Sequence, residues 1–350
     1  MWQSASRQRT VIAIGLATCF LASCSRHHRV AYTPEAAAPG SPATRSTLLD
    51  YHPEPIDLSN HDLDPQGIYD VKHLSFASAG ENGQADNMVT GTYFKSHKPG
   101  RKALIVVLPI WGSSTYPPDM IAKMIRKQSE GTVNVFVMEG KNLVVDWEAI
   151  APVGDPEEFT RVAERMAERM RITGIDVRRF LDWAETQPDF DVERVGLIGF
   201  SIGAVVAAVI APHEPRISST MLVMGGGRPG EILAYCDGRA QKTRQAVTKR
   251  LGWTVDEYRE RMTDIFRNLD PVNYGAMIDP ERVLIFDAEQ DECIPRSAQD
   301  DLWEAMGRPQ RISLPYSHRV AFLAMTPLGG NFVREEIWEF LSRTLLEASP

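Results

Sequence analysis

Short apolar runs alternate along this chain with longer segments whose apolar residues recur every three or four positions. The short runs are typical of buried strands, and the longer spacing is typical of helices that cover a core. The pattern predicts strands near residues 69–77, 88–95, 103–108, 133–138, 195–198, 221–224, 283–286 and 312–314. Because helical segments separate most of these strands, we expect an α/β fold with a mostly parallel central sheet and helices on both faces.

The longest helical segment starts at Asp155, a good capping residue, followed by Pro156 in the first helical position. Apolar residues then recur at helical spacing as far as Leu181, which predicts a stripe that faces the core. A second helical region, residues 228–279, lies between two predicted strands and is largely charged, with helices expected at 241–250 and 255–269. It is longer than an ordinary crossover, so we expect a small cap over the site. The alternative is that these helices simply cover one face of the sheet.

A glycine-flanked serine joins one predicted strand to the following helix. Residues 199–203 read Gly-Phe-Ser-Ile-Gly, after the apolar run at 195–198 and before the small, apolar run at 204–210. A strand, a tight turn and a helix are the setting of a nucleophile elbow, and its glycines leave room for the strand and helix to approach. The chain therefore resembles the α/β-hydrolase superfamily, in particular dienelactone hydrolases and related esterases. This resemblance implies that Ser201 is the nucleophile.

A serine hydroxyl needs a base and a group that orients the base. In α/β-hydrolases these partners follow the serine in the order acid, then histidine. Six of the eight histidines precede Ser201, which leaves His213 and His318. His213 lies in a polar turn directly after the elbow helix and is expected to be solvated. His318 follows the last predicted strand, where the resemblance places the base, so we predict His318.

The acid is expected in the loop after the strand at 283–286. The family pattern there is a small residue, two variable residues, the acid, and later an aliphatic residue and proline; it places the acid at Asp291. Asp287 is the main rival, although a strand-end aspartate can simply cap backbone amides. We expect the other loop acids, Glu289 and Glu292, to be solvated. Some members take the acid from the preceding strand, which would point to Glu231 or Asp237.

The resemblance also implies an oxyanion hole made of two backbone N–H groups. One is expected from Ile202, directly after the nucleophile, and the other from the loop after the strand at 103–108. That loop lacks the His-Gly pair common in the family and looks more like the versions in dienelactone-hydrolase-like relatives. The second donor therefore stays open between two residues of this loop, with Trp111 ahead of Ile110; the Trp111 indole is as readily a packing group.

The first residues resemble a bacterial lipoprotein signal peptide. Two arginines precede a short apolar stretch that ends in Leu-Ala-Ser-Cys at residues 21–24. The resemblance implies cleavage after residue 23, lipid on Cys24 and anchoring to a bacterial membrane, most simply the periplasmic face of the outer membrane. Residues 24–65 are rich in Pro, Ala, Ser and Thr, which predicts a flexible tether before a hydrolase domain at 66–350.

Charge and motif content limit the kinds of partner and cofactor that we expect, and the cysteines raise the question of a disulfide. The formal net charge of −8 argues against nucleic acid as the main partner. The sequence shows no phosphate-binding glycine loop and no clustered metal-ligand pattern, so we expect no cofactor and no metal. Cys236 and Cys293 could form a disulfide in an oxidising compartment or stay as two separate thiols; the sequence leaves both open.

Together these features predict a membrane-anchored serine hydrolase that most simply cleaves carboxylic esters through an acyl-enzyme intermediate, with a small-molecule ester or acyl substrate. A peptidase or an acyltransferase would use the same residues. A protein of another class, a surface lipoprotein that binds a ligand on a hydrolase scaffold without turnover, is the alternative. The missing His-Gly pair is its best support.

Overall fold

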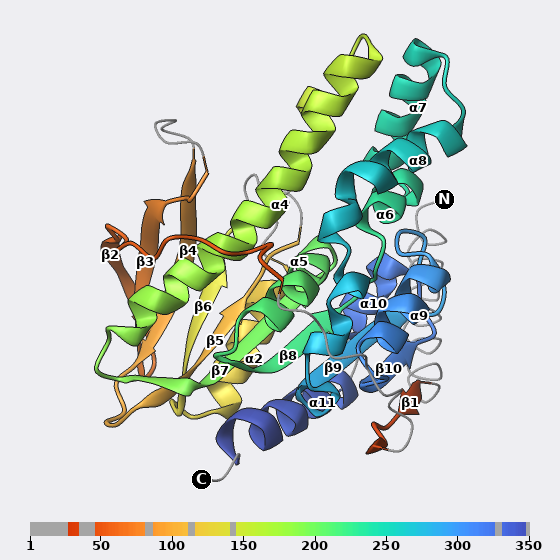
Figure 1. Ribbon diagram of the computed structural model, residues 1–350. Helices are drawn as coiled ribbons and strands as arrows, with labels where there is room; N and C mark the ends of the chain where they lie inside the picture. Colours follow the sequence, from red (N-terminus) through yellow and green to blue (C-terminus); the bar gives the residue numbers. More distant parts are fainter. Residues whose placement is uncertain are drawn as a thin grey trace, which may run out of the picture.

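The computed structural model describes residues 27–34, 46–80, 87–110, 116–140, 145–325 and 331–347. In these residues the strands form one 10-stranded sheet in the order β1-β10-β9-β8-β7-β5-β6-β4-β3-β2 (Figure 1). The strands are β1 His28–Val30, β2 Ser59–Gln66, β3 Tyr69–Ala77, β4 Met88–Ser96, β5 Lys102–Val107, β6 Val133–Met138, β7 Phe190–Phe200, β8 Ile217–Val223, β9 Val283–Ala288 and β10 Gln310–Leu314.

The centre of the sheet is parallel and its two edges are antiparallel. Neighbouring strands from β6 through β5, β7, β8 and β9 to β10 run parallel. Strands β4, β3 and β2 continue the sheet in antiparallel fashion on one side, and β1 does so on the other. This arrangement confirms the mostly parallel sheet expected from the apolar runs. Parallel strands are joined by crossover helices that cover both faces, which is why these strands are apolar throughout.

The helices of the described residues are α2 Pro118–Gln128, α3 Trp147–Ile150, α4 Pro156–Glu185, α5 Ile202–Ile210, α6 Pro229–Tyr235, α7 Arg239–Leu251, α8 Val255–Phe266, α9 Arg296–Ala305, α10 His318–Ala324 and α11 Phe332–Leu341. Short 3₁₀ turns connect them: η2 Ala211–His213, η3 Arg267–Leu269, η4 Pro271–Asn273, η5 Gly275–Met277 and η6 Pro280–Arg282. A short π-helical turn, η8 Ser342–Leu346, follows α11. None of the helices in the described part of the chain combines the length and apolar character needed to cross a membrane.

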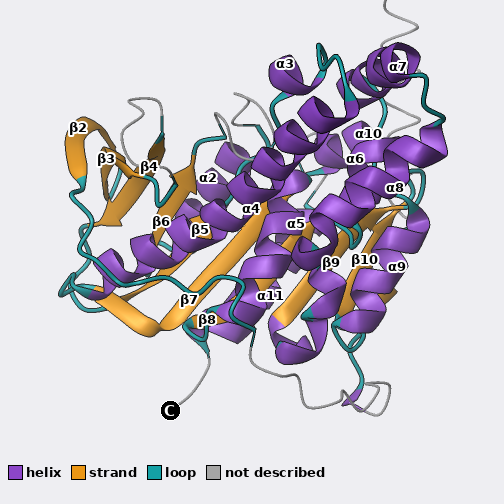
Figure 2. Cartoon of the chain, turned by 45° about the horizontal axis from the view of Figure 1, so that its top comes forward, coloured by secondary structure: helices purple, strands orange, loops and turns teal. Residues whose placement is uncertain are grey.

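Two apolar clusters cover the two faces of the sheet. Along β5 the side chains alternate: Leu104 and Val106 join the cluster that includes α4, α5, α6 and α8, whereas Ile105 and Val107 join the cluster that includes α2, α10 and α11. All six residues of β5 are buried. In Figure 2, α4 and α5 lie in front of the sheet. Successive side chains of a strand point to opposite faces of the sheet. Because both faces are covered here, every position of β5 is buried and its apolar run is unbroken.

Helix α4 is 30 residues long and extends beyond the sheet (Figure 1). Its start is capped as the sequence predicts: the Asp155 carboxylate accepts the Glu158 N–H at 2.8 Å, and Pro156 follows. The projecting first half packs against the helices of residues 228–279. There, Phe159 meets the rings of Trp253 and Tyr258, with centroids 5.1 and 5.4 Å away.

Some residues of the expected tether take part in the fold. Within the expected tether, β1 pairs with β10 and β2 pairs with β3. Leu49 is fully buried and packs on Gly174 of α4, where a Cβ would lie 2.9 Å from Leu49 Cδ1. The average composition of this segment is polar, and an average does not show that a single apolar side chain such as Leu49 is buried in the folded chain. Strands β1 and β2 and the residue Leu49 therefore pack with the sheet and helices of the described chain.

Candidate active site

Ser201 occupies a strained turn between β7 and α5. Its backbone has φ 52° and ψ −118°, in the half of conformational space that residues with a Cβ rarely use. The Ser201 N–H donates to the carbonyl oxygen of Val223 on β8 at 2.8 Å, which holds the turn at the carboxyl end of the sheet. Parallel sheets commonly carry their sites at this end.

The two glycines of the turn are required by packing. A Cβ at Gly199 would lie 2.2 Å from the carbonyl oxygen of Gly203, and a Cβ at Gly203 would lie 2.2 Å from that of Pro109. Both contacts are with backbone, so a side chain would have to push the turn away from α5 or from the segment after β5. The glycines thus let β7, α5 and this segment meet around Ser201.

His318 reaches Ser201 from a loop that follows another strand, β10, which is separated from β7 by β8 and β9 in the sheet. It is the first residue of α10, after β10, and its Nε2 lies 3.0 Å from Ser201 Oγ. The two residues are 8% and 6% exposed, so their contact is shielded from bulk water. The imidazole and the Phe322 ring are nearly perpendicular, with centroids 5.1 Å apart.

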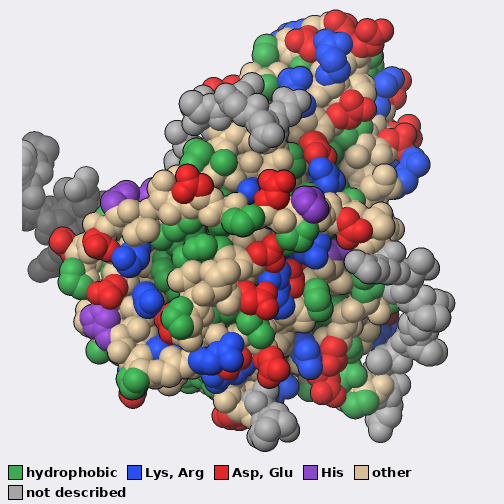
Figure 3. All heavy atoms as spheres, turned by 60° about the vertical axis from the view of Figure 1, so that its left-hand side comes forward, with side chains coloured by type: hydrophobic (Ala, Val, Ile, Leu, Met, Phe, Trp, Pro, Cys, Tyr) green, Lys and Arg blue, Asp and Glu red, His purple; other side chains and the backbone are tan. Residues whose placement is uncertain are grey.

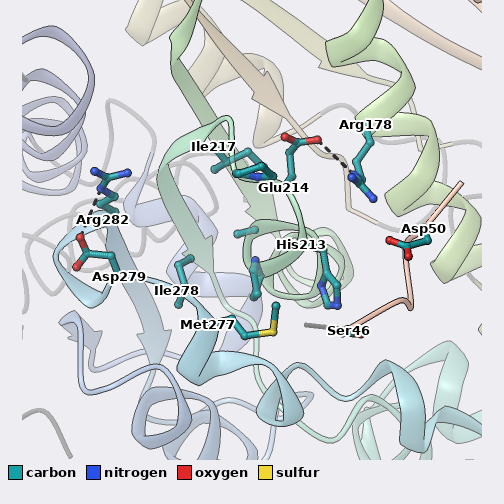
Figure 4. A pocket seen from close by; sticks show the side chains of 13 residues that line it. Ser46, Asp50, Arg178, His213, Glu214, Ile217, Met277, Ile278, Asp279 and Arg282 are labelled. Atoms are coloured by element: carbon teal, nitrogen blue, oxygen red, sulfur yellow. Dashed lines mark hydrogen bonds and ion pairs between the residues drawn. The ribbon is translucent and has the colours of Figure 1, made fainter. Parts of the chain in front are cut away.

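The other candidate base, His213, lies at the far end of α5. It sits in η2, where its Nδ1 is 2.6 Å from the Val209 carbonyl oxygen and its ring meets Tyr274 edge-on. It is half-buried rather than solvated as expected, and burial lowers its pKa. His213 lines a cavity of about 570 Å³, shown in Figure 4. Neither Ser201 nor His318 lines that cavity.

Asp291 holds the opposite edge of the His318 ring. Its Oδ2 is 2.8 Å from His318 Nδ1, so Nδ1 carries the proton of that bond while the carboxylate is ionised. Its Oδ1 accepts the N–H groups of Cys293 and Ile294, both at 2.8 Å. The Asp291 side chain is 1% exposed. Three donors thus satisfy a buried carboxylate that would otherwise be costly.

The other acids considered for this role lie elsewhere. Asp287 is fully buried and pairs with the guanidinium of Arg311, so it is an ion-pair partner rather than a cap for backbone amides. Glu231 pairs with Arg228 at 3.4 Å, and Asp237 is exposed. A neighbouring loop acid that was not a candidate, Glu292, does contact His318.

Glu292 is not the solvated loop charge that the sequence predicts. Its Oε2 accepts the backbone N–H of His318 at 2.8 Å. Glu289, three residues earlier, is exposed. Nothing in the sequence distinguished these two glutamates, because the partner of Glu292 lies 26 residues away along the chain.

The expected oxyanion donors are only partly described. Ile202 is the first residue of α5, and the N–H groups of a first helical turn have no partner within the helix. Trp111 lies outside the described residues, as does the expected lipidation residue, Cys24. The segment after β5 nonetheless comes close to the start of α5, as the Gly203–Pro109 approach shows.

A disulfide ties the loop of Asp291 to the neighbouring helices. Cys293 is bonded to Cys236, which directly follows α6. Both cysteines are buried. Of the two possibilities left open by the sequence, the structure has the bond, and it fastens the loop that carries Asp291 to the 228–279 region.

Tyr116 packs beside α10, where its hydroxyl donates to the carbonyl oxygen of Phe322 at 3.0 Å, and burial raises its pKa. Among the described residues, no group of three or more His, Cys, Asp or Glu side chains is placed to hold a metal ion. On the face shown in Figure 3, acidic and basic side chains are mixed.

No family model matches the chain, and the search of the curated proteins found no match. Solved structures do resemble it. An acetyl xylan esterase from Paenibacillus sp. R4 matches with a TM-score of 0.59 and 16% identity, over 83% of this chain and 90% of that one. Acetyl xylan esterase 1 from Thermoanaerobacterium sp. JW/SL YS485 matches with a TM-score of 0.54 and 16% identity, over 82% and 88%.

The acylaminoacyl peptidase of Pyrococcus horikoshii matches with a TM-score of 0.53 and 13% identity. The match covers 85% of this chain but 43% of the peptidase, so this chain corresponds to less than half of that protein. At such identities a structural likeness informs on the fold and not on the reaction. The mixed sheet with helices on both faces and these matches together show that the chain has the α/β-hydrolase fold.

Proposed function

We propose that this protein is a serine hydrolase that cleaves carboxylic esters through an acyl-enzyme intermediate. The observation that carries the proposal is the continuous contact from Ser201 Oγ through both nitrogens of His318 to Asp291. A hydroxyl, an imidazole and a carboxylate in this order are the parts that activate a serine nucleophile.

In the first half of the reaction, Ser201 Oγ bonds to the ester carbonyl carbon while His318 Nε2 takes the hydroxyl proton. Asp291 keeps the ring in the tautomer whose Nε2 can accept, and its charge stabilises the imidazolium. The tetrahedral intermediate then collapses: the bond to the alkoxy oxygen breaks, and His318 gives its proton to the departing alcohol. In the second half, water attacks the acyl group with His318 again as base, and Ser201 is regenerated.

Negative charge on the carbonyl oxygen of that intermediate needs donors in place before the reaction. The Ile202 N–H at the start of α5 is one, aided by the positive end of the helix dipole. We assign the second to a backbone N–H in the segment after β5, with Trp111 as the candidate. Each donor of this kind lowers the activation free energy of acyl transfer by about 3 kcal/mol.

The names of the similar structures support esters as the first substrates to test. Because one of them is an acylaminoacyl peptidase, amide cleavage by the same residues is the second candidate. Matched p-nitrophenyl esters and p-nitroanilides with the same acyl groups distinguish them. Activated esters are intrinsically more reactive than anilides, so the anilides decide: ester turnover without Ser201-dependent anilide turnover supports the first candidate, and Ser201-dependent anilide turnover supports the second.

We further propose that lipid on Cys24 anchors the enzyme to the cell envelope. The support is the lipoprotein-like sequence at residues 21–24. In a bacterial host, metabolic labelling with a palmitate analogue should mark the natural chain and not a Cys24→Ala variant. Equal labelling of the two would contradict the anchor and leave the hydrolase proposal untouched.

The decisive test is labelling with a fluorophosphonate probe, which reacts only with an activated serine. We expect the natural chain to be labelled and Ser201→Ala to be unlabelled, with ester turnover lowered at least about 10⁴-fold. Ser297→Ala, which changes an exposed serine at the start of α9, is the matched control and should be labelled normally. A folded natural chain that resists the probe would favour a non-catalytic binding protein instead.

A further inference from the structure

Two adjacent carboxylates hold the same histidine at different places. Asp291 contacts the ring of His318 at Nδ1, and Glu292 accepts the His318 backbone N–H, each at 2.8 Å. The first contact orients the imidazole and the second fixes the main chain from which it projects. Only the first is part of the mechanism derived above.

The N-terminus of α10 depends on this second contact. His318 is the first residue of the helix, so its N–H has no acceptor within the helix. The preceding residue, Ser317, is of a type that commonly caps helices, yet its side chain makes no capping hydrogen bond. Glu292 supplies an acceptor from another loop. Because that acceptor is charged, the bond is stronger than one to a neutral group.

The position of the His318 main chain decides whether Nε2 reaches the serine. The Nε2–Oγ distance of 3.0 Å is within hydrogen-bond range, and small displacements would carry it out of range. Misplacing a catalytic group by about 1 Å can slow a reaction about a hundredfold. A contact that holds the first turn of α10 therefore has a direct influence on proton transfer.

The loops themselves do not need Glu292 to stay together. The Glu289 N–H donates to the Leu314 carbonyl oxygen at 2.9 Å, and the Gln290 N–H donates to that of Tyr316 at 3.1 Å. The disulfide at Cys293 adds a covalent tie. These contacts involve backbone or the disulfide, so removing the Glu292 carboxylate leaves them in place.

We propose that Glu292 is a positioning residue for the base: its carboxylate holds the backbone of His318 so that the imidazole stays aligned between Asp291 and Ser201. This inference rests on the proposed function and adds to it a fourth residue beside Ser201, His318 and Asp291.

The test compares Glu292→Ala, Glu292→Gln and the control Glu289→Ala, which removes an exposed carboxylate from the same loop. We expect Glu292→Ala to lower kcat about 10- to 100-fold with KM changed less than about twofold, and to slow fluorophosphonate labelling similarly. Glu292→Gln keeps an acceptor oxygen and should stay within about fivefold of the natural chain. Glu289→Ala should behave like the natural chain.

Hydrogen exchange supplies a readout that does not depend on activity. The peptide that begins at residue 316 should exchange faster in Glu292→Ala than in Glu289→Ala, because the His318 N–H has lost its acceptor. Equal kcat values for the two alanine variants would overturn the proposal. So would a Glu292→Gln variant as slow as Glu292→Ala. A natural chain without Ser201-dependent turnover would contradict the proposed function itself, and the exchange rates would still decide whether Glu292 holds His318.

Discussion

Breaking the disulfide between Cys236 and Cys293 is a sensitive test of how the loop of Asp291 is held. Two contacts connect Asp291 to this cross-link. Asp291 Oδ1 accepts the Cys293 N–H, and the Cys293 sulfur is bonded to Cys236. Reduction converts these two cysteines to thiols and changes no other side chain that the structure describes. It therefore asks what the covalent tie alone contributes.

The size of the effect follows from the loop that the bond closes. The two cysteines are 57 residues apart, and closing a loop of this length removes about 4 kcal/mol of conformational entropy from the unfolded chain. Because both cysteines are buried, a serine in either place adds the cost of burying a hydroxyl, about 1–3 kcal/mol. We therefore expect a loss of about 4 kcal/mol on reduction and a somewhat larger loss in Cys236→Ser or Cys293→Ser.

The assay is urea unfolding followed by tryptophan fluorescence, with and without a phosphine reductant. Reductant should destabilise the natural chain and leave the Cys236→Ser variant unchanged, since that variant has no bond to break. The double variant should lose much less stability than the sum of the two single losses, because each substitution removes the same cross-link; it should differ from a single variant only by the second buried hydroxyl, about 1–3 kcal/mol. Ester turnover should fall with stability in the reduced protein, most steeply near its unfolding midpoint.

Two results would refute this reasoning. One is an unfolding midpoint that reductant does not move, which would mean that the cross-link is absent or contributes nothing. The other is strict additivity of the two serine substitutions, which would show that the cysteines act as independent buried thiols.

Two further predictions concern buried carboxylates. Asp291→Asn should lower kcat about 10⁴-fold with little change in stability, because the amide favours the wrong imidazole tautomer. Asp287→Asn should instead destabilise the fold by about 3 kcal/mol, because Arg311 loses its buried partner and keeps only the part-exposed Asp300. A reversal of these two patterns in paired turnover and unfolding measurements would reject our choice of acid. Burial raises the pKa of Asp176, 3% exposed on α4, to about 6 despite bonds from Ser78 and the backbone, so the folded chain holds this proton more tightly than the unfolded chain does. Stability should therefore fall by on the order of 3 kcal/mol as the pH rises through the range from about 4 to about 6, and Asp176→Asn should remove that part of the pH dependence; an unchanged profile in urea titrations would contradict it.

The sequence alone determined the central part of the architecture, because buried strands and core-facing helices leave a local pattern, whereas the edge strands β1 and β2 left none. Each residue of β5 is buried, so its run is unbroken, and the spacing along α4 identifies its core-facing side. The glycines around Ser201 were also readable, since a strained turn needs small residues within a few positions. The approximate places of His318 and Asp291 came from the resemblance to a family, not from periodicity.

Tertiary structure decided what depends on partners far apart in the chain. Asp287 and Glu292 both looked like ordinary strand-end or loop acids, yet one is buried against Arg311 and the other holds the backbone of His318. The pairing of Cys236 with Cys293 and the burial of Leu49 are of the same kind. Local composition carries no information about which distant group a side chain meets, because that is set by how the crossovers bring the loops together at one end of the sheet.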